Sequence, residues 1–329
     1  MSILISAIPG RQMAKHPNKQ SNRPVLPPLD VLSDVLGTVR LHGTVFGSLD
    51  LMAPWGLAAA PRDQFIFHIV ARGECWLEAD GGKPVHASTG DVLLLAPRIG
   101  HTLRDAPGSP ARPFEQVIAS LRPTDDPRAM QLVCGGFRVD DDTLLRALPR
   151  VIHTHELASD AGPWLAQTVR LLAFESSHDH PGGATVVSRV CDALFVYVIR
   201  SVLAKLPPRD ASWLRGLVTP KIGDALRLMH AEPGREWTVQ ELAHRVGMSR
   251  SAFADQFARV TGETPLQYLI QWRVHKAASL LRAGDASISE IAAQVGYRSD
   301  VALAKAFKRA LGTTPGAYRR DRQAPGGSV

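Results

Sequence analysis

The most reactive side chains in the sequence are three thiols, Cys75, Cys134 and Cys191. They are odd in number, far apart and in no Cys-x-x-Cys pair, which argues against a secreted disulfide framework and favours a reducing cytoplasm. Cys75 and Cys134 could undergo sulfenate or disulfide chemistry, so a redox sensor is one hypothesis. The competing interpretation is simple burial, because free cysteine is among the most buried residue types and is then usually inert.

Two histidines, His68 and His101, could ligate a metal ion, since imidazole is a common ligand of transition metals. A protein metal site normally needs three or four ligands, and the sequence holds no His-x-His pair near either residue. We therefore expect a hydrogen-bonded histidine pair, with no metal and no cofactor.

The charge of the chain is concentrated at one end. Residues 221–329 hold 16 Lys and Arg against 10 Asp and Glu, whereas residues 1–220 hold 22 against 21. A basic end makes a polyanion a reasonable partner, although Lys and Arg also form ordinary solvated surfaces. No apolar run reaches the roughly 20 residues needed to cross a bilayer.

The hydrophobic pattern changes twice along the chain. Between residues 38 and 121, short apolar runs are broken by Gly, Pro and Asp, which predicts many short strands in a sandwich or barrel. After Cys134 the apolar spacing becomes helical, and residues 184–205 form either a core helix or a dimer interface. Two prolines with charged neighbours then indicate an interdomain linker.

The C-terminal third contains a repeat with a period of about 50 residues. Capping-box sequences, Thr238 with Glu241 and Ser287 with Glu290, predict a helix start in each copy. Each of those helices is followed by a glycine suited to a sharp turn, and then by a serine suited to capping a second helix. The matching glycines and serines are Gly247 with Gly296 and Ser249 with Ser299.

A Thr-Pro pair begins a third helix in each copy, at residues 264–265 and 314–315. Helix, tight turn and helix is the arrangement that places a second helix in a DNA major groove. Between the copies, residues 265–282 read as one helix of roughly 27 Å. Such a rod could hold two reading helices about one DNA turn, near 34 Å, apart. A bundle or solenoid pair that only looks similar is the alternative.

Residues 291–320, "IAAQVGYRSDVALAKAFKRALGTTPGAYRR", resemble the signature of the AraC/XylS transcription regulators, and the resemblance covers residues 221–320. It implies that the second helix of each unit contacts bases. The residues expected to contact DNA are Ser249, Arg250, Ser251, Ala254, Asp255, Arg298, Ser299, Asp300, Val301, Ala304 and Lys305, with Arg319 and Arg320 for phosphates. Asp255 departs from the arginine that is common in the family. An acidic residue there could accept a hydrogen bond from cytosine, or could face away from DNA.

The core of the two units is expected to be apolar and aromatic. The residues assigned to it are Phe253, Phe257, Tyr268, Trp272, Leu303 and Phe307.

Residues 67–82 and 90–103, with "LVCGGF" and "RALPRVIHT" beyond them, are similar to the cupin-like effector domains that precede such DNA-binding pairs. The resemblance implies a small β-barrel, and we expect a ligand in its mouth near His68, Trp76 and His101. The expected fold is therefore α+β in two domains, a cupin-like barrel with a helical extension and an all-α double helix-turn-helix. Its expected parts are a leader (1–28), an effector and dimerisation domain (29–205), a linker (206–220), the DNA-binding domain (221–320) and a tail (321–329).

The sequence thus predicts a cytoplasmic, non-enzymatic and effector-responsive transcription regulator. Its expected partners are double-stranded promoter DNA, a small-molecule effector, a second copy of the chain and, for an activator, RNA polymerase. Three alternatives remain open at this point: a cupin metalloenzyme with an auxiliary DNA-binding module, a redox-sensing regulator that uses Cys75 and Cys134, and an architectural DNA binder.

Overall fold

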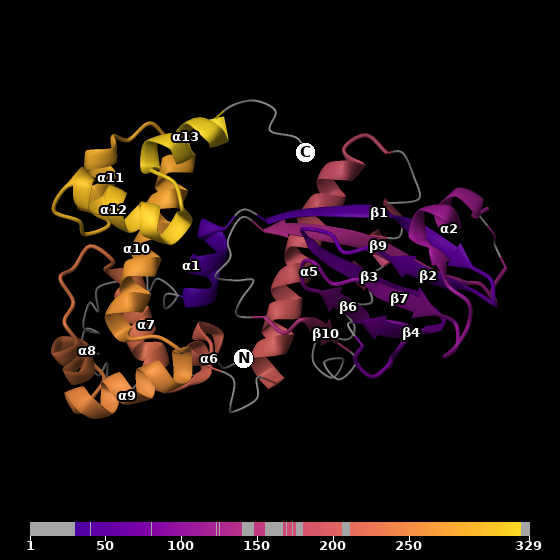
Figure 1. The fold of residues 1–329 in the computed structure, drawn as a ribbon, viewed down its shortest axis with the longest axis horizontal. Coiled ribbons are helices and arrows are strands. Elements are labelled where there is room, and N and C mark those ends of the chain that lie inside the picture. Colours follow the sequence, from indigo (N-terminus) through magenta and orange to yellow (C-terminus); the bar gives the residue numbers. More distant parts are fainter. Residues whose placement is uncertain are drawn as a thin grey trace, which may run out of the picture.

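The computed structural model describes residues 30–39, 41–79, 81–122, 124, 126–139, 148–154, 167–168, 170–172, 174–175, 180–205 and 211–323. A sheet-rich domain and a helical domain lie side by side, with α1 (Val31–Thr38) between them (Figure 1). The expected α+β, two-domain fold is confirmed. The expected leader, most of the tail and part of the helical extension lie outside the described residues. Within the described part, no helix is both long and apolar enough to cross a membrane.

The described residues of the N-terminal domain form two five-stranded sheets. The first has the order β1 (Leu41–Leu51), β9 (Met130–Val139), β3 (Phe65–Arg72), β6 (Val92–Leu95) and β10 (Val151–His153). The second has the order β5 (Val85–Ser88), β4 (Glu74–Ala79), β7 (His101–Arg104), β2 (Gly56–Ala59) and β8 (Arg112–Pro113). Neighbouring strands are antiparallel except for β2 and β8, which are parallel.

The core of this domain lies between the two sheets. Leu57, Leu77, Leu93, Leu103 and Leu132 are all fully buried there. Buried and more exposed side chains alternate along β4, as in a strand with one face in the core, and Cys75 and Leu77 point inward. Strand β3 is buried along most of its length, since helices cover the other face of its sheet. Helix α2 (Phe114–Ser120) lies beside β2.

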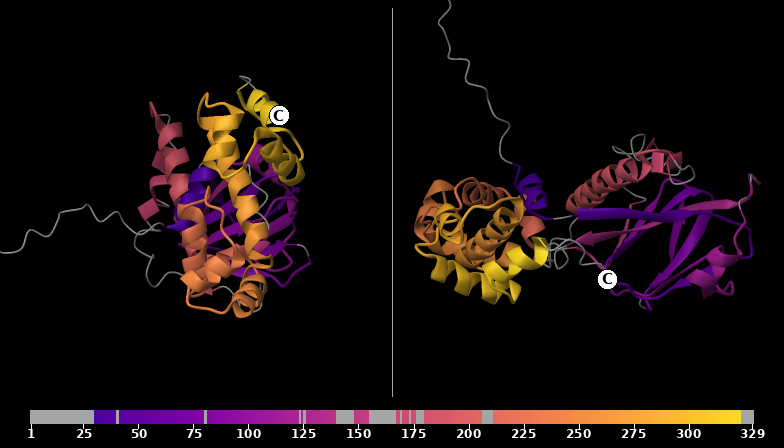
Figure 2. Two further views of the ribbon diagram at one scale, coloured as in Figure 1. Left: turned by 90° about the vertical axis from the view of Figure 1, so that its left-hand side faces the viewer. Right: turned by 90° about the horizontal axis from the view of Figure 1, so that it is seen from above.

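Helix α5 (Gly183–Lys205) crosses the outer face of the first sheet, beside β1 (Figure 2). Its residues Cys191, Phe195 and Ile199 are fully buried, because they follow one face of the helix at intervals of four. Gly43 of β1 allows this approach, since a Cβ there would lie 2.3 Å from the Cβ of Cys191. The helix predicted at residues 184–205 is therefore present and buries one face in the core.

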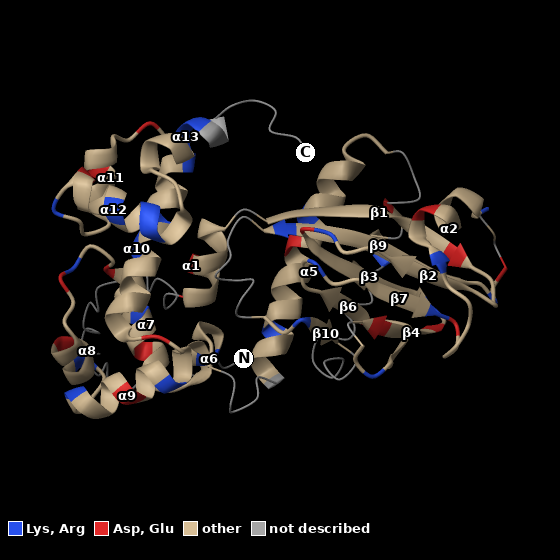
Figure 3. Ribbon diagram, viewed as in Figure 1, with Lys and Arg blue, Asp and Glu red and all other residues tan. Residues whose placement is uncertain are grey.

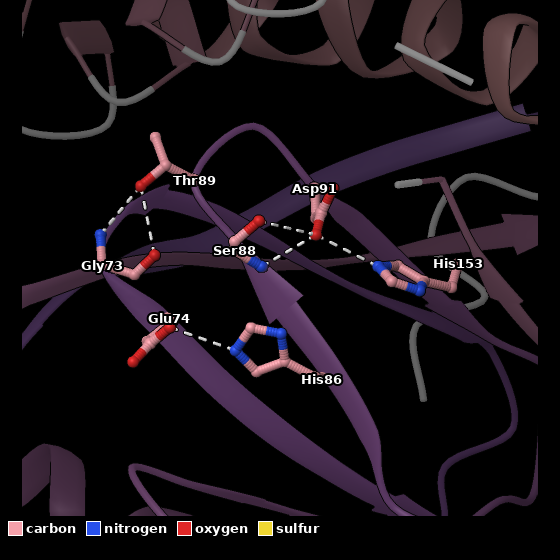
Figure 4. A network of polar contacts seen from close by, with 7 residues as sticks. All are labelled: Gly73, Glu74, His86, Ser88, Thr89, Asp91 and His153. Atoms are coloured by element: carbon pink, nitrogen blue, oxygen red, sulfur yellow. Dashed lines mark hydrogen bonds and ion pairs between the residues drawn. The ribbon is translucent and has the colours of Figure 1, made fainter. Parts of the chain in front are cut away.

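A buried carboxylate ties β10 to the turn between β5 and β6 (Figure 4). Asp91 accepts hydrogen bonds from the Ser88 backbone N–H at 2.7 Å and from Nε2 of His153 at 3.1 Å. The Val92 backbone N–H donates to Oγ1 of Thr154 at 2.8 Å. These contacts hold β10 against β6.

The C-terminal domain is helical throughout its described residues. Its helices are α6 (Trp213–Val218), α7 (Ile222–Ala231), α8 (Val239–Arg245), α9 (Arg250–Thr261), α10 (Pro265–Ala283), α11 (Ile288–Gln294), α12 (Asp300–Leu311) and α13 (Pro315–Gln323). Helix α6 falls inside the expected linker of residues 206–220. Trp213 and Leu214 are buried, and the Ser212 N–H donates to the Val260 carbonyl, so this part of the expected linker packs onto the helical domain.

Helix α1 precedes the first strand in the sequence but packs against α7 and α10. Val31, Leu32 and Val35 are buried in one continuous core that also includes α5 and the first part of the helical domain. Asp34 pairs with Nδ1 of His230 at 2.9 Å and with Nζ of Lys276 at 3.3 Å. The two domains therefore share a packed and ion-paired junction.

Candidate nucleic-acid interface

The first helix-turn-helix unit is built by its caps and one glycine. Oγ1 of Thr238 accepts the Glu241 N–H at 3.1 Å and begins α8, and the Ser249 side chain caps α9 through the Ala252 N–H. Between these helices Gly247 has a φ of 65°, which a residue without a Cβ adopts without strain. The predicted capping box is only half formed, because the Glu241 carboxylate pairs with the Arg235 guanidinium instead of the Thr238 N–H.

The second unit repeats this construction. Ser287 and Glu290 form the complete capping box that the sequence predicts, and Ser299 caps α12 through the Ala302 N–H. Gly296 has a φ of 86°, and a Cβ there would lie 2.8 Å from the carbonyl oxygen of Gly234. The same sequence signals thus produce the same local structure in both copies.

Helix α10 joins the two units. It begins with the predicted Thr-Pro pair, in which Thr264 forms a capping box with Gln267, and its 19 residues span about 28 Å. Arg273 donates to the Pro233 carbonyl through Nε and to the Arg235 carbonyl through Nη2, both at 2.7 Å. The rod is thereby tied to the segment before α8.

The residues predicted to be core are buried. Phe253, Phe257, Leu303 and Phe307 are fully buried, and Tyr268 and Trp272 are nearly so. Each unit therefore rests on an aromatic core beneath the helix that follows its turn.

The predicted contact positions lie on the solvent side of α9 and α12. In the first unit Ser249, Arg250, Ser251 and Asp255 are exposed, and Ala254 is half-buried. In the second, Arg298, Ser299, Asp300, Val301 and Lys305 are exposed, and Ala304 is half-buried. Val301, in the first turn of α12, is 58% exposed. A methyl-bearing side chain there could contact a thymine methyl group.

Basic residues recur along α12 and α13 (Figure 3). Lys308 and Arg309 of α12 are exposed but were not among the predicted contacts, although their spacing of three and four from Lys305 could have indicated them. The exposed Arg298 pairs with Glu236 at 2.8 Å. Arg319 is half-buried and donates to the Ala286 carbonyl, whereas Arg320 is exposed. Of these last two, Arg320 is the better placed for a phosphate.

In the N-terminal domain the structure brings His68 and His101 together. Their Nε2 atoms lie 2.7 Å apart, and Nδ1 of His68 lies 3.1 Å from Sγ of Cys134. Burial lowers the pKa of both imidazoles, so both are neutral at pH 7. Nδ1 of His101 faces the Ile99 carbonyl at 3.4 Å, and a carbonyl only accepts. The hydrogen bonds therefore run in one direction: the Cys134 thiol donates to His68, His68 donates to His101, and His101 donates to the Ile99 carbonyl.

Trp76, the third residue expected near the effector, packs against the ring of His86 and not against the histidine pair. It alternates with the inward-facing Cys75 and Leu77 along β4, so it occupies the other face of the strand. A hollow of about 430 Å³ opens instead at the ends of β2, β4 and β7, where Glu78, His101 and Thr102 contribute to its wall.

These contacts do not fit a cupin metal centre. Among the described residues, no group of three or more His, Cys, Asp or Glu side chains could hold a metal ion. The two imidazoles hydrogen-bond to each other, and burial raises the pKa of Cys134 so that its thiol stays protonated. Metal binding needs deprotonated thiols and free imidazole lone pairs.

The cysteines are placed for packing. Cys75, Cys134 and Cys191 are all buried and unpaired, and burial raises the pKa of Cys75 and of Cys191 to about 12. The thiolate is the reactive form of cysteine, so these environments oppose oxidation. This geometry favours the packing interpretation over the redox sensor.

Comparison with known proteins adds independent findings. Residues 30–204 match a family model described as Cupin, and residues 242–321 match one described as a helix-turn-helix domain. A Streptomyces lividans protein named as an AraC-like transcription regulator is 34% identical over 90% of this chain and 100% of its own. The HTH-type transcriptional regulator AlkR of Acinetobacter baylyi is 29% identical over 89% of this chain and 100% of its own. The DNA-binding domain of AdpA, solved in complex with a target DNA, is 39% identical, covers 32% of this chain and 98% of its own, and has a TM-score of 0.31.

Proposed function

Because this chain belongs to the AraC/XylS family of transcription regulators, we propose that both of its helix-turn-helix units read one promoter sequence under the control of a small-molecule effector. DNA is the partner that the family implies. The observation that carries the proposal is the pairing of two capped and glycine-turned units on one rod, each with an exposed polar face on its second helix. A single chain could then contact two successive major-groove segments.

The bases that each helix-turn-helix unit could contact follow from the chemistry of its exposed side chains. Arg250 and Lys305 can donate to guanine, Asp255 and Asp300 can accept from cytosine, and Val301 can contact thymine. Two units with the same framework but different exposed residues would read different bases. Arg320 would contact a phosphate and position the second unit.

The experiment compares two basic residues of the second unit. Against a site selected from random DNA, Lys305→Ala should lose preference at one base position, whereas Arg320→Ala should weaken binding to all sequences by a similar factor and lower the salt slope by about one. Anisotropy titrations with single-base variants of the site measure both effects. If Lys305→Ala instead weakened binding to all sequences by the same factor, Lys305 would not contact a base.

We propose that the effector binds in the hollow beside His101, at the ends of β2, β4 and β7. Small ligands bind in hollows of this size, and Glu78, His101 and Thr102 offer polar groups in its wall. If the regulator activates transcription, we expect it also to contact RNA polymerase. We propose further that two copies of the chain form a homodimer through residues 184–205. Val186 of α5 is exposed and could take part in such a dimer. Light scattering of the purified chain, with and without Val186→Glu, tests the dimer.

A further inference from the structure

The two helix-turn-helix units lie at opposite ends of α10 (Figure 1), and their apolar cores are separate. Phe253 and Phe257 of the first unit belong to the core that continues into α1 and α5. Leu303 and Phe307 of the second unit belong to a different core. Long helices curve, so a helix fixes the distance between its ends better than the angle between groups attached to them. Contacts between the units beside α10 therefore bear on the angle between α9 and α12.

One such contact involves Arg273, in the middle of α10. Its half-buried guanidinium donates to the carbonyls of Pro233 and Arg235, both at 2.7 Å. The planar guanidinium group can make two such bonds at once in a fixed geometry. Its Cζ also lies 5.9 Å from the ring centroid of Tyr297, in the turn between α11 and α12. Arg273 thus contacts the segment before α8 and the turn of the second unit.

The backbones of these two segments also meet directly, residues 233–236 of the first unit against residues 294–298 of the second (the inter-unit contact). A Cβ on Gly234 would lie 3.0 Å from the carbonyl oxygen of Gln294. A Cβ on Gly296 would lie 2.8 Å from the carbonyl oxygen of Gly234. The two backbones are therefore so close that a side chain on either glycine would push them apart.

An ion pair lies at the edge of the inter-unit contact. Glu236 and Arg298 pair at 2.8 Å, and both side chains are exposed. Exposed ion pairs contribute little to stability, because water and salt screen them. We therefore expect the inter-unit contact to depend mainly on Arg273 and on the two glycines.

We propose that Arg273 is a positioning residue, which holds the inter-unit contact together and so sets the spacing between half-sites that the chain accepts. This inference rests on the proposed reading of DNA by two units. With the contact formed, α9 and α12 keep one angle and meet two major-groove segments at one separation. Without it, α10 still joins the units, but each unit can turn independently of the other.

The first test needs no DNA. Spin labels are attached to the full chain at Arg259→Cys on α9 and Ala310→Cys on α12, both exposed positions, and pulsed EPR measures the distances between them. The three native cysteines are buried, and a chain without the introduced cysteines checks that they stay unlabelled. We expect one narrow distance distribution with Arg273 in place. In Arg273→Gln the distribution should be about twofold wider or more, because the units then sample several orientations.

Gly234→Ala disturbs the same contact without changing the charge. Its Cβ would meet the Gln294 carbonyl oxygen, so the distance distribution should widen, though less than in Arg273→Gln. The matched control is Gly284→Ala, between α10 and α11, where the backbone is extended and nothing lies within 4 Å of an added Cβ. Circular dichroism checks that each variant is folded. An unchanged distribution in folded Arg273→Gln overturns the proposal, and Gly234→Ala decides in the same way if Arg273→Gln does not fold.

The second test uses the selected DNA site, the same site with one base pair added or removed between its half-sites, and each half-site alone. One base pair turns a half-site by about 35° around the duplex, so the native chain should bind both altered sites at least about tenfold more weakly. Arg273→Gln should bind each half-site like the native chain, within about twofold, but the selected site at least about fivefold more weakly, because its second unit has a lower effective concentration. It should also discriminate less between the three spacings.

Arg227→Gln controls for the loss of one positive charge, since Arg227 is exposed and pairs with Asp224 of its own helix. It should keep the native preference for one spacing. An equal loss of affinity for half-sites and for the selected site in Arg273→Gln would show that Arg273 only supports the fold of a unit, and would overturn the proposal. If the native chain binds every spacing equally, the two-unit account fails and the spacing role fails with it. The EPR result still decides separately whether Arg273 fixes the angle between the units.

Discussion

Cys134, His68 and His101 form a hydrogen-bonded chain whose direction one backbone carbonyl sets. Because the Ile99 carbonyl can only accept, His101 carries its proton on Nδ1, and its Nε2 accepts a hydrogen bond from the Nε2–H of His68. The sequence predicts the pairing of the two histidines, and it leaves open whether Cys75 and Cys134 are redox-active or simply buried. The expected position of Trp76 near the histidine pair is wrong, because its ring packs against His86 on the other face of β4. Which face of a strand a residue occupies depends on the pairing register with neighbouring strands, and the sequence alone does not give that register.

At this scale we predict that acid destabilises the histidine pair. The pKa of each imidazole is lowered from 6.5 in the folded chain, so below pH 6.5 the unfolded chain binds more protons. The free energy of unfolding should therefore fall as the pH drops from 7.5 to 5.5, by up to about 1.4 kcal/mol per pH unit for each histidine. His230 shifts in the same direction. Urea unfolding at several pH values should show a shallower dependence in His101→Gln, and an unchanged dependence would contradict the assignment.

Among the elements, the helices of the two units were the most predictable. Their starts depend on caps and their turns on glycine, and both are local signals that the sequence carries directly. The sequence predicts a linker where α6 lies, because two prolines and charged residues precede this helix and its six residues are too few to show a period. Its packing depends on Trp213 and Leu214 meeting α7 and α9, which are distant contacts.

The two turn glycines make a matched pair. Gly247 and Gly296 both have positive φ, so an alanine at either position costs about 1–2 kcal/mol in backbone strain. A Cβ at Gly296 also meets the Gly234 carbonyl oxygen at 2.8 Å, whereas at Gly247 nothing lies within 4 Å. Thermal unfolding should therefore show a larger loss for Gly296→Ala than for Gly247→Ala. Equal losses would mean that the second turn relaxes without cost.

For the whole molecule, the main feature is that α1 belongs to the N-terminal part of the sequence but packs on the helical domain. Asp34 and His230 are 196 positions apart, so no local pattern could have predicted their contact. The Thr38 carbonyl also accepts from Arg282 of α10. Since β1 begins shortly after α1, a shift of the barrel would act directly on the rod that joins the two units.

We predict that this junction stabilises the chain. Asp34→Asn removes the negative charge that faces His230 and Lys276 and should lower the free energy of unfolding by about 1–3 kcal/mol. Asp224→Asn, which changes an exposed carboxylate paired with Arg227 of its own helix, should have less than half that effect. Urea denaturation of the full chain compares the two, and equal effects would show that the junction adds no stability.

The most direct test of the two-unit account is the affinity of the full chain for its selected site with five base pairs inserted between the two half-sites. The insertion turns one half-site to the opposite face of the duplex, while α10 holds both units on one side. We predict that the dissociation constant rises to the value for a single half-site, far above that for the intact site but below that for unrelated DNA. Unchanged affinity for the inserted site, or equal affinity for unrelated DNA, would contradict sequence reading by two units on one rod.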